Sequence, residues 1–233
     1  MSQLRRLDQL LANLGHGSRR EVRDLIERGN VEVRGEICYD IDLRVAPEEV
    51  TFRGQPLEAP DGLLAMLHKP LGYVCTHSDK EGPTIYELLP EAWLKRNPAV
   101  TSVGRLDKDT SGLLLMTDQG KLVQRFTSPK SDIQKVYEVT VDRPLDPRLI
   151  EVFAKGGLML NGEDKPCLPA QLQIVDDLHG RLILSEGRYH QVRRMFASQG
   201  WEVTTLHRSL FGEYSLEDLE AGQWRLLPVP DVG

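Results

Sequence analysis

The sequence predicts an α+β protein, in which a small N-terminal helix–helix–hairpin domain precedes a larger domain built on a mixed, mainly antiparallel β-sheet. Two patterns lead to this fold class. Over the first 38 residues, apolar side chains recur twice at helical spacing and then alternate as they do in paired strands. Beyond residue 62, strand-like runs of uneven spacing have few helical runs between them, which is typical of an α+β domain.

The two N-terminal helices are predicted from their apolar faces and their ends. The first has leucines three or four residues apart and ends at Gly15. The second begins at Ser18, which can cap free backbone amides while Glu21 reaches back to it, and it ends at Gly29. The apolar residues of these helices are Leu4, Leu7, Leu10, Leu11 and Leu14, then Val22, Leu25 and Ile26.

A tight hairpin and a linker follow the helices. VEVRGEIC (31–38) consists of two short alternating segments around Arg34–Gly35. GQPLEAPDG (54–62) is rich in Pro and Gly and interrupts the apolar periodicity. We therefore expect a first domain over residues 1–55, a linker over residues 56–62 and a second domain over residues 63–233.

The second domain is long enough to bury a sizeable core. Its strands are predicted from apolar or alternating runs, and its helices from apolar residues at helical spacing. The predicted strands are LLAML (63–67), SVG (102–104), GLLLMT (112–117), KVYEVTV (135–141) and RLILS (181–185). The predicted helical segments lie near residues 84–96, 147–155 and 189–199.

Charge alone gives weak evidence about binding partners. With 35 acidic and 29 basic residues the net charge is −6, which on average opposes binding to nucleic acid. The acidic residues are concentrated in residues 36–60 and 212–233, where each balance is −4, whereas residues 1–35 and 185–208 each have a balance of +2. Two segments are therefore locally basic, and binding to RNA should depend on docking geometry more than on bulk charge.

The chain shows no targeting, membrane or disulfide pattern. Its first residues carry charges inside their apolar pattern, unlike a signal peptide, and no apolar run approaches the roughly 20 residues of a membrane helix. Cys38, Cys75 and Cys167 form no CxxC pair, and the six histidines are not at metal-ligand spacing. We expect a soluble, cytoplasmic and monomeric protein with no cofactor, no metal and no contact with a membrane.

The densest polar motif is GRLDKDTSGLLLMTD (104–118). Gly104 and Gly112 bracket a polar loop that contains Asp107, and the apolar strand behind this loop can hold it rigidly. Taken alone, the motif is more simply interpreted as a turn in which Asp and Thr side chains cap the backbone.

A second motif, SEGRYHQVRRMFASQGWEVTTLHR (185–208), combines a short helix with four arginines. Apolar residues occupy one face of this helix, so the arginines lie beside or opposite that face. A solvated basic helix face is the alternative interpretation. Two further segments, LHKPLGYVCTHSD (67–79) and KVYEVTV (135–141), contain Lys69 and Tyr137.

Together these segments resemble two known families. RLDQLLANLGHGSRREVRDLIERGNVEVRGE is similar to the RNA-binding module shared with small-subunit ribosomal protein S4. KPLGYVC, GRLDKDTSGLLLMT, KVYEV and EGRYHQVRRMF, in this order, resemble the pseudouridine synthases, in particular the branch that modifies ribosomal RNA and often carries the S4-like module. KPLGYVCTHSD, RRMFASQG and LHR look most like the enzymes that act on 16S rRNA, and this resemblance implies the uridine at position 516 as the target.

The resemblance also implies roles for individual residues, once the uridine has been flipped out of the RNA. Asp107 is the essential carboxylate, which acts as a nucleophile on the sugar or the base or removes a proton in a glycal-type route. Arg193 is its basic partner and should lower its pKa by about 1–3 units, enough to offset moderate burial. Tyr137 packs on the flipped uracil, and Arg105 occupies the gap left in the RNA stack.

Contacts to RNA phosphates are implied for six other basic residues. An arginine guanidinium can donate two parallel hydrogen bonds to phosphate oxygens. The candidates are Arg5, Arg19, Arg20 and Arg23 in the S4-like module and Lys69 and Arg188 in the second domain.

The implied partner is 16S ribosomal RNA, either free or within a ribosomal assembly intermediate, and three alternatives remain. A non-catalytic S4-like assembly factor would bind RNA without needing the set Asp107, Tyr137 and Arg193. A synthase acting on 23S rRNA would share most of the motifs. A hydrolytic glycosidase would need a second positioned carboxylate, and Asp109 is too close in sequence to Asp107 to be identified as one.

Overall fold

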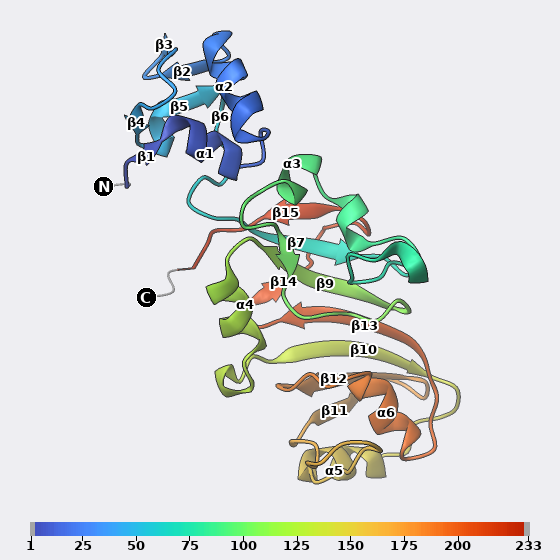
Figure 1. Cartoon of the computed structure of the whole chain (residues 1–233). Helices are drawn as coiled ribbons and strands as arrows, with labels where there is room; N and C mark the ends of the chain where they lie inside the picture. The colour runs from blue at the N-terminus through green and yellow to red at the C-terminus, as the bar shows by residue number, and fades with distance from the viewer. Residues whose placement is uncertain (1–2, 231–233) are drawn as a thin grey trace.

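The chain folds into two parts: the first holds a two-stranded and a four-stranded sheet, and the second holds a nine-stranded sheet (Figure 1). The computed structural model describes residues 3–230. The first part contains β1 (Arg5–Arg6), α1 (Leu7–Asn13), α2 (Arg19–Glu27), β2 (Val31–Val33), β3 (Glu36–Ile37), β4 (Arg44–Val45), η1 (Pro47–Glu49), β5 (Val50–Phe52) and β6 (Gln55–Pro56).

The predicted capping box and hairpin of the first part are confirmed. The Glu21 amide donates to Ser18 Oγ at 3.3 Å, and the Ser18 amide donates to Glu21 Oε2 at 2.7 Å, so two free donors at the start of α2 are satisfied. Arg34 and Gly35 have φ of 55° and 82°, the left-handed conformation that a two-residue hairpin turn requires. The first helix begins later than its leucines suggest, because Arg5–Arg6 pair with Arg44–Val45 as strands.

The second part is a mixed, mainly antiparallel sheet flanked by helices, which confirms the predicted fold class. The strand order is β11-β12-β10-β13-β9-β7-β15, and within this order only β13 and β9 are parallel. The elements are β7 (Leu64–Lys69), η2 (Asp79–Glu81), η3 (Ile85–Leu88), α3 (Glu91–Leu94), β8 (Thr101–Ser102), β9 (Thr110–Thr117), α4 (Gly120–Thr127), η4 (Pro129–Ser131), β10 (Lys135–Val141), α5 (Arg148–Lys155), β11 (Gln171–Ile174), β12 (His179–Leu184), α6 (Gln191–Ala197), β13 (Val203–Phe211), β14 (Tyr214–Ser215) and β15 (Trp224–Leu226).

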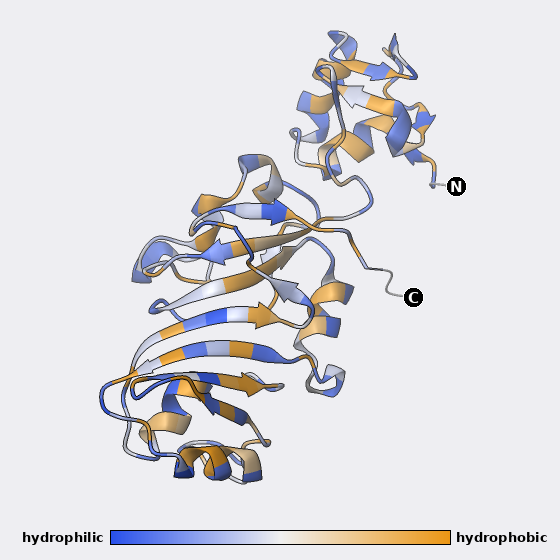
Figure 2. Ribbon diagram, turned by 180° about the vertical axis from the view of Figure 1, so that it is seen from behind, coloured by the Kyte–Doolittle hydropathy of each residue, from blue (hydrophilic) through white to orange (hydrophobic). Residues whose placement is uncertain are grey.

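Strand β9 is buried on both faces and anchors the loop that precedes it. Leu114 and Met116 face the large apolar cluster that α5 and α6 cover, whereas Leu113 and Leu115 face a second cluster under α4. Polar and apolar residues alternate along β10 and β12, as Figure 2 shows, because these strands bury one face only. The motif that contains Asp107 is therefore joined directly to the best-buried strand of the molecule.

The parallel pairing of β13 with β9 depends on Gly112. A Cβ atom at this position would lie 2.3 Å from the carbonyl oxygen of Arg208, and the φ of 118° also favours glycine. The close approach brings the two longest motifs of the sequence, 104–118 and 185–208, side by side at one end of the sheet.

Candidate active site

Three of the four sequence motifs of the second part line one cleft of about 770 Å³. The loop before β9 contributes Asp107, strand β10 contributes Tyr137, the loop and first turn of α6 contribute residues 188–192, and β13 contributes Arg208. A volume of this size is in the range of small-ligand and nucleotide sites. The fourth motif, which contains Lys69, supports the Asp107 loop from behind, as described below.

Asp107 lies half-buried in this cleft, with 27% of its side chain exposed, and its contact is a histidine. His190 Nε2 lies 3.3 Å from Asp107 Oδ1. The loop is closed by a hydrogen bond from the Thr110 amide to the Asp107 carbonyl, at 3.0 Å. His190 was not among the predicted site residues. The signal that points to it is its place within RYHQVRR, the motif that also holds Arg193.

The pKa of Asp107 is raised above its ordinary value, contrary to the sequence-based expectation. Burial is the largest cause, because it penalises the charged carboxylate, and the nearby Asp109 adds to it. Attraction from His190, then from Arg193 and Lys69, favours the ionised form but does not offset these effects. The predicted compensation of burial by Arg193 is therefore wrong for this arrangement.

Arg193 lies behind the Asp107 loop and pairs with the neighbouring carboxylate. Its Nη2 donates to the Asp109 carbonyl and lies 2.9 Å from Asp109 Oδ2, while its Nη1 donates to the Val203 carbonyl at 2.6 Å. The sequence analysis assigned the contact with Asp107 to Arg193 alone. In the structure His190 contacts Asp107 directly, and Arg193 holds the loop through Asp109.

The structure places Tyr137 and Arg105 in the cleft. Tyr137 lies on β10, opposite Arg208 on β13 and Leu182 on β12, and is 9% exposed. Arg105 is an exposed residue of the lining and makes no hydrogen bond or ion pair with the residues that the structure describes. The cleft is thus lined by a buried aromatic ring, a carboxylate and a free cation. Their roles in catalysis stay predictions.

Lys69 does not contact RNA, because it is fully buried. Its Nζ donates to the carbonyls of Pro70 and Thr110 at 3.0 and 2.8 Å, so it ties the end of β7 to the Asp107 loop. Burial lowers the pKa of this amine. The predicted phosphate contact is therefore wrong. Lysines are usually exposed, but here hydrogen bonds to two carbonyls allow the amine to be buried.

Arg188 lines the cleft, but its guanidinium already has several partners within the protein. Its guanidinium donates to the carbonyls of Lys165 and Pro166 and to Glu186, and it lies 3.5 Å from Glu163. These contacts already occupy its donors, and its phosphate contact stays a prediction.

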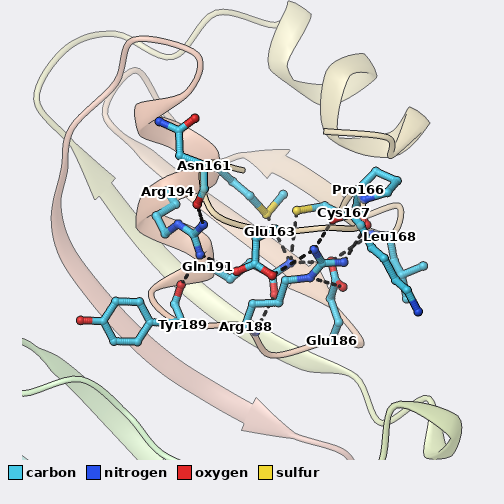
Figure 3. A network of polar contacts seen from close by, with 12 residues as sticks. Asn161, Glu163, Pro166, Cys167, Leu168, Glu186, Arg188, Tyr189, Gln191 and Arg194 are labelled. Atoms are coloured by element: carbon cyan, nitrogen blue, oxygen red, sulfur yellow. Dashed lines mark hydrogen bonds and ion pairs between the residues drawn. The ribbon is translucent and has the colours of Figure 1, made fainter. Parts of the chain in front are cut away.

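The contacts of Arg188 belong to a network that fixes one wall of the cleft (Figure 3). Arg194 donates to Glu163 at 2.8 Å and to the Tyr189 carbonyl at 2.9 Å. The loop over residues 161–168 is thereby bound to the loop over residues 185–190 and to α6. The charges are paired in a partly buried setting, where charge-assisted hydrogen bonds hold a defined geometry.

The four candidate arginines of the first part differ in their surroundings. Arg5 binds the Pro60 carbonyl and Asp61, and Arg23 lies 3.3 Å from the buried Asp8, so both already have acidic or carbonyl partners. Arg19 and Arg20 are exposed at the start of α2 and make no polar contact with the part of the chain that the structure describes. Arg19 and Arg20 are therefore the candidates free to bind phosphates.

Among residues 3–230, no three His, Cys, Asp or Glu side chains gather in a way that could hold a metal ion. No helix within the same residues is long and apolar enough to span a bilayer.

Comparison with known proteins shows the family. The family model described as RNA pseudouridylate synthase matches residues 64–198, and the S4 domain model matches residues 5–50. A protein of Pasteurella multocida (strain Pm70) named ribosomal small subunit pseudouridine synthase A is 39% identical over 230 residues, which cover 97% of each chain. A protein of the same name from Escherichia coli (strain K12) is 40% identical over 232 residues, 97% of this chain and 98% of that protein.

A solved structure leads to the same family. It is described as the crystal structure of a pseudouridylate synthase, is 39% identical to this chain and covers 96% of both chains with a TM-score of 0.65. With a family model matching more than half of the chain and relatives that cover nearly all of it, the chain belongs to the RNA pseudouridylate synthase family and is an isomerase with an S4 domain in its first part.

Proposed function

We propose that this chain converts a uridine of small-subunit (16S) ribosomal RNA to pseudouridine, and that its target is the uridine at position 516. The observation that carries the proposal is the extent of the likeness. Relatives named for the small ribosomal subunit cover 97% of the chain, so they share both the S4 domain and the cleft rather than one of them.

The chemistry is assigned to the cleft around Asp107. The uridine is flipped out of the RNA, which costs a few kcal/mol of stacking and pairing, and enters between Tyr137 and the Asp107 loop. The ionised Asp107 then attacks the sugar or the base, or removes a proton, and the N1–C1′ bond breaks. After the uracil has turned, C1′ bonds to C5, any bond to Asp107 is broken again, and the proton that C5 loses is balanced by one gained at N1, so the step needs no co-reactant. Arg193 acts on this step by holding Asp109, and so the loop, in place.

We expect the acid limb of kcat/KM against pH to lie above the ordinary titration range of aspartate, near 3.9. The reason is that the reaction needs the carboxylate of Asp107, and burial raises the pKa of this group, so activity is lost at a higher pH on acidification. The measurement is pseudouridine formation by the full chain on 16S rRNA at subsaturating RNA across the acidic range.

Two variants should shift the acid limb of this pH profile in opposite directions. Asp109→Asn removes a like charge and releases Arg193, so the acid limb should move to lower pH. His190→Gln removes the largest attraction that favours ionised Asp107, so the limb should move to higher pH. Shifts in the same direction for both variants would show that a group other than Asp107 controls the limb.

The free arginines of α2 should provide an electrostatic anchor on the RNA. Replacing Arg19 and Arg20 by alanine is expected to weaken rRNA binding and to lower the slope of log affinity against log salt by up to about 2, because each phosphate contact contributes somewhat less than 1. Affinities measured at several salt concentrations give this slope. Arg44→Ala, which removes one exposed charge on β4, is the control, and a slope change there of half that of the double variant or more would remove α2 from the anchor.

The function itself is tested by mapping pseudouridines. In cells without this protein, one 16S site should lack pseudouridine, and the purified chain should restore it on 16S rRNA transcripts or on assembly intermediates. Loss of a 23S site instead would assign the chain to the other subunit. An unchanged map, together with intact RNA binding, would favour a non-catalytic assembly factor.

A further inference from the structure

The rim of the cleft carries an exposed aromatic ring that the proposed catalytic steps do not use. Tyr189 is 68% exposed, the highest exposure of any large apolar or aromatic side chain in the described part of the chain. Its ring stacks on the imidazole of His190, with centroids 3.9 Å apart and planes at 17°. Since His190 Nε2 lies 3.3 Å from Asp107 Oδ1, this stack joins the rim of the cleft to the candidate carboxylate.

The backbone under this stack is held in a fixed and strained conformation. His190 has φ of 46° and ψ of 35°, the left-handed region that non-glycine residues rarely adopt. The Tyr189 carbonyl accepts a hydrogen bond from Arg194, which is itself paired with Glu163. Figure 3 shows the Tyr189 ring pointing away from this network, so the network anchors the main chain and leaves the ring free. Such strain is maintained where the surroundings impose it, often at binding sites.

The stack leaves one face of Tyr189 open to a planar ligand. His190 covers the inner face of the Tyr189 ring, and the imidazole of His190 contacts Asp107. The outer face of Tyr189 is therefore separated from Asp107 by both rings. A base on the outer face is therefore not the base whose glycosidic bond reacts at Asp107. Two exposed cations of the same lining, Arg105 and Lys165, have no ion-pair partner among residues 3–230 and suit a phosphate backbone beside the stacked base.

We propose that Tyr189 is a stacking platform for one nucleobase next to the flipped uridine, so that the RNA is held on that side of the break in its stack. The inference rests on the proposed function, because it places an RNA strand in the cleft. Stacking on an aromatic ring is tolerant of base identity, so the platform recognises an unstacked neighbour rather than a particular base. The preset backbone lowers the ordering cost of binding.

The test combines protein and RNA changes. Tyr189→Ala should lower kcat/KM on an rRNA fragment with the target uridine by about tenfold or more, as removal of a stacking aromatic does, whereas Tyr189→Phe keeps the ring and should retain activity near that of the unchanged chain. An abasic nucleotide on one side of the target should cause a similar loss with the unchanged chain and little further loss with Tyr189→Ala.

Each other result overturns the inference. These are equal activity of Tyr189→Ala and the unchanged chain, equal loss in Tyr189→Phe and Tyr189→Ala, and full additivity of Tyr189→Ala with abasic nucleotides on both sides. An equal melting temperature for the two variants separates loss of the platform from loss of folding. If the unchanged chain forms no pseudouridine in 16S rRNA, the proposed function fails first; activity in the unchanged chain with an unaffected Tyr189→Ala rejects the platform alone.

Discussion

Replacing Asp107 by asparagine is expected to lower pseudouridine formation at least about 10⁴-fold while rRNA binding is retained. Asparagine keeps the size of the side chain and its ability to accept a hydrogen bond from His190, but it has no negative charge to attack the sugar or base or to take a proton. Binding should survive because the S4 domain and the free cations of the rim lie outside the substituted group. Single-turnover assays and equilibrium binding on the same 16S transcript measure the two quantities separately.

The same substitution should not reduce stability. A carboxyl whose folded-state pKa is raised binds protons more tightly in the folded chain than in the unfolded chain. Its contribution is favourable at low pH and is lost as pH rises through the folded-state pKa, so at neutral pH the charged Asp107 destabilises the fold. Asp107→Asn should therefore melt at the same temperature as the unchanged chain or at a higher one. An active variant, or an inactive one that melts lower and no longer binds RNA, would contradict the assignment of Asp107.

The sequence predicts the scaffold better than the contacts within the site. The hairpin at Arg34–Gly35 and the capping box at Ser18 depend on residues close to each other in sequence, so both can be predicted from a short stretch of sequence. Helix α4 escaped prediction because only two of its residues, Leu122 and Phe126, are buried, and it begins at a glycine. Strand β13 escaped because polar residues interrupt its apolar ones.

The contacts of the site depend on the approach of distant segments. The meeting of His190 with Asp107 brings the start of α6 onto the loop before β9, two segments 83 residues apart, and no local pattern encodes it. Lys69 illustrates the same point, since a lysine after a strand is usually exposed and only the carbonyl of Thr110 explains its burial. The sequence thus indicated which motifs carry the chemistry, and the tertiary structure decides which side chain touches which.

The segment between the two parts is bound to the second part by a buried ion pair. Arg96 Nε donates to Asp118 Oδ2 at 2.8 Å, and the two side chains are only 4% and 8% exposed. The remaining Arg96 donors bind the carbonyls of Glu58 and Ala59, and the other Asp118 oxygen accepts from the Leu63 amide at 2.8 Å. One pair therefore satisfies backbone groups on both sides of residues 60–62 and fixes the path of the linker.

Arg96→Met should accordingly lower the free energy of unfolding of the second part by about 3–5 kcal/mol, because it leaves the buried carboxylate of Asp118 and two linker carbonyls without their partner. Urea unfolding followed by tryptophan fluorescence measures this change, because all three tryptophans, Trp93, Trp201 and Trp224, lie in the second part. Arg5→Met is the matched control: Arg5 also binds the linker, at Pro60 and Asp61, but this pair is exposed and should contribute no more than about 1 kcal/mol.

Loss of the pair between Arg96 and Asp118 should affect activity on a long RNA more than loss of an ordinary core contact would. With the linker released, the free arginines of α2 no longer stand at a fixed distance from the cleft, so kcat/KM on 16S rRNA should fall more than the folded fraction does. On a short RNA that contacts only the cleft, the activity per folded molecule should be unchanged. Equal losses on the long and the short RNA would mean that Arg96 contributes to folding alone and does not set the position of the S4 domain.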